Sequence, residues 1–109
     1  MHNISDIKGT FTLRNGVNMP YLGLGVFQSK DGLEVVNAVK WALETGYRHI
    51  DTASVYNNEK GVGRGIRESE VNREDIFLVS KVWNSDQGYE STLKAFDASL
   101  RRLQTDYLD

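Results

Sequence analysis

The sequence predicts an α/β fold with a parallel sheet, and two patterns support this prediction. Short apolar runs at residues 22–26, 47–52 and 76–82 alternate with longer segments in which apolar residues recur at helical spacing. Strands that alternate with helices in this way form parallel sheets through right-handed crossovers. No linker, low-complexity tract or change of composition divides the chain. We therefore expect a single α/β domain over residues 1–109.

A tight hairpin is expected before the first strand of the sheet. Apolar and polar residues alternate on both sides of residues 11–19, and the Asn15-Gly16 pair between them is typical of a short turn. The strand at 22–26 comes next, and its glycines by themselves are weak signals because glycine pairs occur in many strand-to-loop turns.

Helices are expected between and after the strands. The first covers residues 31–45 and ends at Gly46, which can adopt the left-handed cap conformation. The second covers 59–69, with Glu59 at the positive end of the helix dipole. The third has one apolar stripe, made by Leu93, Phe96, Leu100 and Leu103. After it, Tyr107 and Leu108 are expected to begin a fourth strand.

The composition argues against several classes of function. With 39% hydrophobic residues and no apolar run near the ~20 residues of a membrane helix, the chain has no predicted membrane span. A net charge of −2 argues against nucleic acid as the main partner. The chain has no cysteine and two histidines far apart, so no metal site is expected. The start Met1-His2-Asn3 lacks a signal segment, which predicts a cytoplasmic location.

An acid, a tyrosine and a lysine stand where apolar strands run out. Asp51 ends the strand at 47–52, Tyr56 follows five residues later, and Lys81 lies in the strand at 76–82. A buried strand of a parallel sheet carries a charge only if another charge compensates it, and Asp51 and Lys81 can compensate each other. An ammonium group beside a phenol favours the phenolate form. The combination predicts a site for proton transfer.

Each of these residues also has a structural interpretation. Asp51 could be an ordinary ion-pair partner or a helix-capping acid, and Tyr56 could be a loop tyrosine with its hydroxyl in water. Lys81 could pack its aliphatic stem on apolar neighbours while its ammonium reaches the strand end. The lysine would occupy the same position in both interpretations.

Three further features are interpreted as structural or left open. The glycines at residues 61–65 follow a loop and lack the GxGxxG spacing of a dinucleotide fingerprint, so packing of the helix on a barrel explains them better. A lone histidine is usually structural, and we assign His49 no catalytic role. Trp83 could belong to the core, yet the carboxyl end of a barrel strand is where substrates bind.

Several segments together resemble the aldo-keto reductases, most closely the small bacterial members that reduce aldehydes and glyoxals. The resemblance covers nearly the whole chain. Its segments are Leu13-Arg14-Asn15-Gly16-Val17-Asn18-Met19-Pro20, Leu22-Gly23-Leu24-Gly25-Val26-Phe27-Gln28, Gly46-Tyr47-Arg48-His49-Ile50-Asp51-Thr52-Ala53 with Tyr56, Ser80-Lys81-Val82-Trp83-Asn84, and Asp106-Tyr107-Leu108-Asp109.

The resemblance implies the N-terminal part of a (β/α)8 TIM barrel with an N-terminal β-hairpin, and reduction of a small carbonyl substrate by NADPH. Tyr56 would be the general acid, Lys81 would favour its phenolate, and Asp51 would hold Lys81 in place. The backbone at Gly25, Val26 and Phe27, together with Asp51, would contact the cofactor. The substrate would lie against an apolar wall formed by Phe27, Val55 and Trp83, next to the acid Tyr56.

The resemblance further implies that a catalytic histidine and most cofactor contacts lie beyond Asp109. A (β/α)8 barrel needs roughly 250 residues, and three strand–helix units cannot close one. Two functions are therefore expected as alternatives. The first is the N-terminal portion of an NADPH-dependent reductase, inactive by itself. The second is a noncatalytic half-barrel module that covers its sheet edges by self-association or by pairing with the rest of a barrel.

Overall fold

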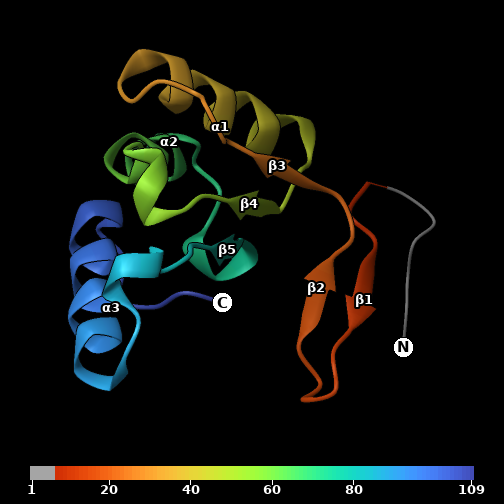
Figure 1. The fold of residues 1–109 in the computed structure, drawn as a ribbon. Helices are drawn as coiled ribbons and strands as arrows, with labels where there is room; N and C mark the ends of the chain where they lie inside the picture. The colour runs from red at the N-terminus through yellow and green to blue at the C-terminus, as the bar shows by residue number, and fades with distance from the viewer. Residues whose placement is uncertain (1–6) are drawn as a thin grey trace.

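A two-stranded hairpin precedes a three-stranded parallel sheet in residues 7–109, the part of the chain that the computed structural model describes. Three helices lie along the outer side of the sheet (Figure 1). The alternation of strands and helices confirms the predicted α/β class. Met1-His2-Asn3, on which the expected cytoplasmic location rests, lies outside the described residues.

The hairpin forms as predicted. Strand β1 (Thr10–Thr12) pairs antiparallel with β2 (Asn18–Pro20), with Phe11 opposite Met19. The turn between them holds Gly16 at a φ of +87°, a conformation that glycine adopts at little cost. The Asn15 side chain accepts a hydrogen bond from the backbone N–H of Val17 at 3.1 Å. The turn chemistry therefore fixes the register of the two strands.

The parallel sheet consists of β3 (Gly23–Gly25), β4 (His49–Asp51) and β5 (Phe77–Val79), in that order. Gly25, Asp51 and Val79 lie at matching positions, so all three strands end at one edge. Each strand is shorter than its apolar run. Beyond the paired residues single backbone hydrogen bonds continue, from the Thr52 N–H to the Val79 carbonyl at 2.8 Å and from the Ser54 N–H to the Lys81 carbonyl at 3.1 Å.

Helix α2 (Glu59–Glu68) packs between α1 (Leu33–Thr45) and α3 (Tyr89–Leu103). Helix α1 begins two residues later than predicted, because Gly32 has a φ of +90° and stands outside the helix. It ends before Gly46, whose φ of +121° agrees with the predicted cap. The buried core between helices and sheet is Val26, Val35, Val39, Leu43, Ile50, Val62, Ile66, Ile76, Leu78 and Leu103.

The glycines of α2 serve close helix packing. A Cβ atom on Gly65 would lie 2.8 Å from the Cβ of Val39 in α1, and one on Gly63 would overlap the Leu103 carbonyl in α3. These distances leave no room for a side chain. The glycines therefore serve close packing, as predicted, but the expected partner is wrong, because the tight contacts are to the two neighbouring helices and not to the barrel sheet.

The apolar stripe of α3 is only partly buried. Leu103 is 2% exposed, but Leu93 is 50% and Phe96 is 38% exposed. The first turns of the helix thus keep an apolar face toward solvent in the described part of the chain. Burial increases toward the carboxyl end of the helix, where α3 meets α2.

The segment after α3 runs beside β5 but is not a strand, so the predicted fourth strand is not formed at Tyr107 and Leu108. The Asp109 N–H donates to the Leu78 carbonyl at 2.9 Å, as a neighbouring strand would. The Tyr107 carbonyl, however, already accepts hydrogen bonds from Arg73 Nη2 at 2.7 Å and from the Thr105 hydroxyl at 3.2 Å. These side chains take the acceptor that a regular ladder would use.

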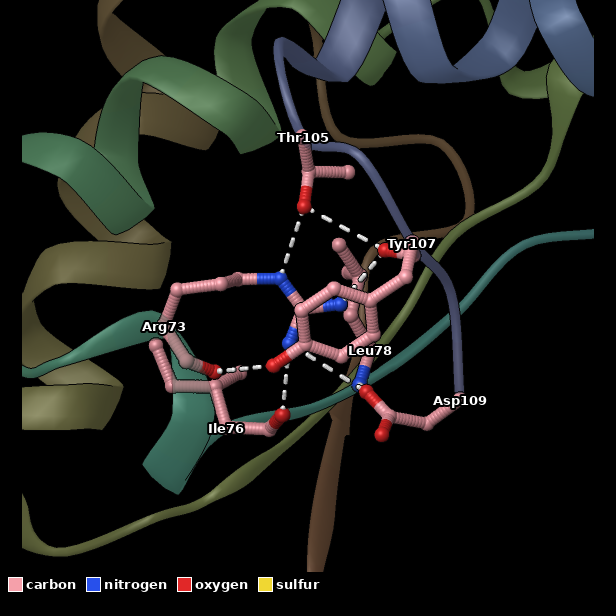
Figure 2. Close-up of polar contacts among 6 residues, drawn as sticks. All are labelled: Arg73, Ile76, Leu78, Thr105, Tyr107 and Asp109. Atoms are coloured by element: carbon pink, nitrogen blue, oxygen red, sulfur yellow. Dashed lines mark hydrogen bonds and ion pairs between the residues drawn. The ribbon is translucent and has the colours of Figure 1, made fainter.

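Arg73 is the centre of this connection (Figure 2). Its guanidinium donates to Thr105 Oγ1 at 2.9 Å and to the Ile76 carbonyl at 2.8 Å, and it pairs with Asp109 at 3.2 Å. The guanidinium also lies 3.9 Å from the centre of the Tyr107 ring, within the range of a cation–π contact. We call Arg73, Thr105, Tyr107 and Asp109 the Arg73 clamp. It fastens the end of the chain to the amino-terminal half of β5.

Within residues 7–109, no helix has the length and apolar character needed to cross a membrane. The cytoplasmic location stays a prediction.

Candidate active site

The three residues predicted to form a proton-transfer site come from neighbouring loops at one edge of the sheet. Asp51 is the last residue of β4, and Tyr56 ends the short 3₁₀ helix Ser54–Tyr56 that follows it. Lys81 lies two residues after the end of β5. Because parallel strands β4 and β5 end at the same level, their loops bring these side chains together.

Lys81 forms the expected ion pair with Asp51. The ammonium also donates a hydrogen bond to the Thr52 carbonyl at 2.9 Å, and this second contact restricts its position further. It lies 5.4 Å from the centre of the Tyr56 ring, within cation–π range. The described residues therefore assemble an acid, a cation and a phenol in one place.

This ion pair is more exposed than the sequence predicts. The Lys81 side chain is 48% and the Asp51 side chain 41% accessible. The reason is that β5 ends at Val79, so Lys81 belongs to a loop and not to a buried strand. Its charge consequently needs less compensation than a buried one would.

An apolar pocket adjoins the tyrosine. The Phe27 and Tyr56 rings lie 5.3 Å apart between centroids, and Phe27 is 66% exposed. A cavity of about 440 Å³ opens beside them, a size that suits a small organic molecule. Its lining includes all four residues expected at the substrate; the full lining is Phe27, Ala53, Val55, Tyr56, Lys81, Val82, Trp83 and Asn84.

The backbone expected beside a cofactor leaves room for one. A Cβ atom on Gly25 would meet no atom within 4 Å, so the space over this end of β3 is open. Gly25 lies opposite Asp51 in the sheet, next to the ion pair. Val26 is fully buried, its N–H donates to the Asp51 carbonyl at 3.2 Å, and its carbonyl accepts from the Ser29 N–H at 3.0 Å. The expected cofactor contact at Val26 is therefore wrong for this structure, because the residue exposes neither side chain nor backbone to a ligand. The open space beside Gly25 and the exposed Phe27 ring leave room for a ligand at this end of β3.

His49 has a structural environment, in agreement with its interpretation from the sequence. Its Nδ1 lies 3.1 Å from the Pro20 carbonyl, and its ring meets the edge of Phe77 at 5.1 Å between centroids. It also packs on Gly23, where a Cβ atom would lie 2.8 Å from the imidazole Cγ. His49 connects the hairpin to the sheet and lies at the opposite end of β4 from Asp51.

Sequence reasoning missed Asn58, and assigned Glu59 only a dipole contact. Both are buried, at 0% and 2% exposure, directly after the loop that carries Tyr56. An asparagine before a helix is typical of an N-cap, but the Asn58 side chain makes no cap hydrogen bond and reaches the neighbouring loops instead. No local pattern reveals this, because the two carbonyls that Asn58 binds, those of Val26 and Ser29, lie 32 and 29 residues away.

A sequence model of the family described as "Aldo/keto reductase family" matches residues 13–109. Glyoxal reductase of Bacillus subtilis is 59% identical over 105 residues, which are 96% of this chain and 38% of that protein. Among solved structures, an aldo/keto reductase of Brucella melitensis is 59% identical with a TM-score of 0.87, covering 92% of this chain and 39% of that one.

A second solved structure, a Bombyx mori aldo-keto reductase in complex with NADP, is 38% identical with a TM-score of 0.83. It is matched over 92% of this chain and 36% of its own length. The chain thus spans little more than a third of the relatives that it matches.

Proposed function

The chain belongs to the aldo/keto reductase family, and we propose that it supplies the proton-transfer groups of an NADPH-dependent reductase that converts small aldehydes and ketones to alcohols. The hairpin and the three strand–helix units correspond to part of the family's (β/α)8 barrel. The observation that carries the proposal is the Lys81 ammonium, which is paired with Asp51 and lies over the Tyr56 ring.

NADPH, when bound, supplies the hydride that reduces the carbonyl carbon. Tyr56 acts as the general acid and gives its hydroxyl proton to the carbonyl oxygen as negative charge develops there. The Lys81 ammonium stabilises the phenolate that remains, through an attraction between opposite charges. Asp51 holds the ammonium at this position through the ion pair.

The binding roles follow from space and polarity. Gly25 and Phe27 would contact the cofactor at the open end of β3, with Asp51 beside them. Phe27, Val55 and Trp83 would form the apolar wall on which the carbonyl substrate lies, next to the acid.

A chimaera tests the proposal. Residues 1–109 replace the segment that they match in Bacillus subtilis glyoxal reductase, and the oxidation of NADPH by glyoxal is followed by absorbance. We expect turnover that depends on both compounds. A chimaera that folds and melts cooperatively, but consumes no NADPH, would contradict the proposed function.

The 109 residues alone should show negligible turnover. Binding energy from the remote parts of a cofactor positions its reactive carbon. The chain covers little more than a third of the length of the relatives that it matches, so most of the contacts to those remote parts should be missing. The purified polypeptide is assayed in parallel with the chimaera. Robust turnover by the short polypeptide would mean that the essential residues have been misjudged.

A second candidate function is a noncatalytic module that acts by association. The observation in its favour is the exposed apolar face of α3, where Tyr89, Leu93 and Phe96 are 84%, 50% and 38% exposed. Within the described residues β3 pairs with one strand only, and the outer edge of β5 is met by Asp109 alone and not by a strand. Light scattering over a concentration series should show association, and a strictly monomeric, cooperatively melting polypeptide would contradict this candidate.

A further inference from the structure

The two buried polar residues at the start of α2 connect the loops that form the candidate site. Asn58 is fully buried and Glu59 is 2% exposed. They follow Tyr56 by two and three residues, so they lie at the base of the loop that presents the phenol. Burying a polar side chain is costly unless partners satisfy it, and each of these residues has partners in other loops.

Asn58 holds the loop after β3. Its Nδ2 donates to the Val26 carbonyl and to the Ser29 carbonyl, both at 3.0 Å. Its Oδ1 accepts from the Thr52 hydroxyl at 2.7 Å. Between the two carbonyls lies Gln28, a non-glycine residue with a φ of +67°, a conformation that costs energy outside glycine. The Asn58 amide thus fastens a strained loop, and Phe27 lies within it.

Glu59 holds the loop after β5. Its Oε2 accepts from the Ser80 hydroxyl at 2.6 Å, and Ser80 directly precedes Lys81. Its Oε1 accepts from Arg102 Nε at 2.6 Å, which brings in α3. The Glu59 side chain is 1% accessible and the Arg102 side chain 36%, so the carboxylate has few alternatives to these partners. Its position therefore restricts where the Lys81 backbone can lie.

We propose that Asn58 and Glu59 are positioning residues that act on different sides of the site. Asn58 sets the cofactor-side loop at Val26 and Phe27, and Glu59 sets Lys81 through the Ser80 hydroxyl. Neither touches the reacting atoms. This inference rests on the proposed function, since it assigns the positions of that same site.

The division of roles predicts two different kinetic effects in the chimaera. Asn58→Ala removes the two hydrogen bonds that the Asn58 amide donates to the loop after β3. The loop then loses its fixed position, and the Kd for NADPH should rise about tenfold, which corresponds to one or two hydrogen bonds of ordinary strength. At saturating NADPH its kcat should stay within about twofold, because Asn58 reaches the Lys81 side only through the Thr52 hydroxyl, while the ammonium is bound by the Thr52 carbonyl and by Asp51. Asn58→Ser, which is milder, provides the same test if the alanine variant does not fold.

The Glu59 side is tested through its partner. Ser80→Ala removes the hydroxyl and should lower kcat about tenfold, while the Kd for NADPH stays within about twofold. Ser80→Thr keeps a hydroxyl at the same position and should restore kcat. Recovery by threonine separates positioning from a general loss of packing.

Ser69→Ala is the matched control. Ser69 is 5% exposed at the other end of α2, and its hydroxyl donates to the Ile66 carbonyl at 2.7 Å and accepts from the Val71 N–H at 3.2 Å. It should lower the melting temperature without changing kcat or the Kd for NADPH.

The possible outcomes distinguish a failure of the positioning roles from a failure of the proposed reductase function. If the unsubstituted chimaera turns over and the Asn58 and Ser80 variants behave like Ser69→Ala, the positioning roles are wrong and the proposed function stands. If the folded chimaera does not turn over, both are overturned. If each variant lowers kcat and affinity in equal proportion, the division between the two residues is wrong.

Discussion

The ion pair of Arg73 and Asp109 lies beside the amino-terminal half of β5, whereas the pair of Lys81 and Asp51 lies beyond the carboxyl ends of β4 and β5. The side chains of the first pair are 20% and 23% accessible, and those of the second are 48% and 41% accessible. Arg73 also binds three further protein oxygens, while the Lys81 ammonium faces an open apolar pocket.

The difference shows how the position of a charge pair on this sheet determines its use. Arg73 has its hydrogen-bonding capacity taken up by the protein, so it contributes stability. Lys81 keeps part of its surface available to a ligand. The same separation is general in barrels of parallel strands, where the carboxyl ends carry chemistry and the amino ends carry stability. The following substitutions in the chimaera test whether the separation holds here.

Lys81→Met should have the largest effect, and the effect should be on turnover. Loss of the ammonium removes the charge that stabilises the Tyr56 phenolate, so kcat should fall at least about a hundredfold. The pair is half exposed, so the free energy of unfolding should change by less than about 1 kcal/mol. Lys94→Met, an exposed lysine on α3, is the control and should change neither. A large loss of stability in Lys81→Met would abolish the contrast.

Arg73→Met should have the reverse profile. It leaves Asp109 without its cation and removes hydrogen bonds to Thr105, Ile76 and Tyr107. We expect the free energy of unfolding to fall by about 3 kcal/mol, with kcat unchanged in the folded fraction. Denaturant unfolding measures the loss, and Arg64→Met, whose side chain is 52% accessible, is the control. An unchanged midpoint would show that the clamp adds no stability.

Two glycines of one strand should separate the same properties. Gly25→Val places a side chain in the open space over β3 and should raise the Kd for NADPH about tenfold, with little loss of stability. Gly23→Val places one against the His49 ring and should lower the melting temperature instead. Cofactor fluorescence and thermal melts distinguish the two. Equal NADPH affinity of the unsubstituted chimaera and Gly25→Val would show that this end of β3 does not contact the cofactor.

The smallest effect is expected at Glu68 on the surface of α2. The Arg64 guanidinium, which donates a hydrogen bond to it, lowers the pKa of Glu68 below its ordinary value of 4.5. A carboxyl group whose pKa is lowered by folding stabilises the folded protein at pH values above its ordinary pKa. This contribution is lost as the pH falls through the lowered pKa. Glu68→Gln should therefore melt slightly below the wild type at neutral pH, and the gap should close in acid. A gap that widens in acid would contradict the sign.

The local patterns of the sequence predict the fold and the three central side chains well. Turn chemistry at Asn15 and Gly16, helical spacing in α1 and the glycine cap at Gly46 are local properties, and each forms as predicted. Asp51 and Lys81 could be paired because the order of parallel strands places their ends together.

The predictions that were wrong or incomplete depend on contacts between distant residues. The fourth strand is not formed at Tyr107 because Arg73, far away in sequence, takes its carbonyl. The burial of Lys81 was overestimated because an apolar run does not show where pairing stops. Asn58 was missed because its partners at Val26 and Ser29 come from another loop.

The role of the carboxyl-end site in proton transfer is tested by Tyr56→Phe in the chimaera, with NADPH binding and glyoxal reduction measured on the same preparation. The substitution removes one hydroxyl and keeps the ring that contacts Phe27. We expect the Kd for NADPH and the melting temperature to be retained and turnover to be lost, because only the proton donor has gone. Turnover equal to that of the unsubstituted chimaera would contradict the assignment of Tyr56 as the acid and, with it, the use of the carboxyl-end ion pair for chemistry.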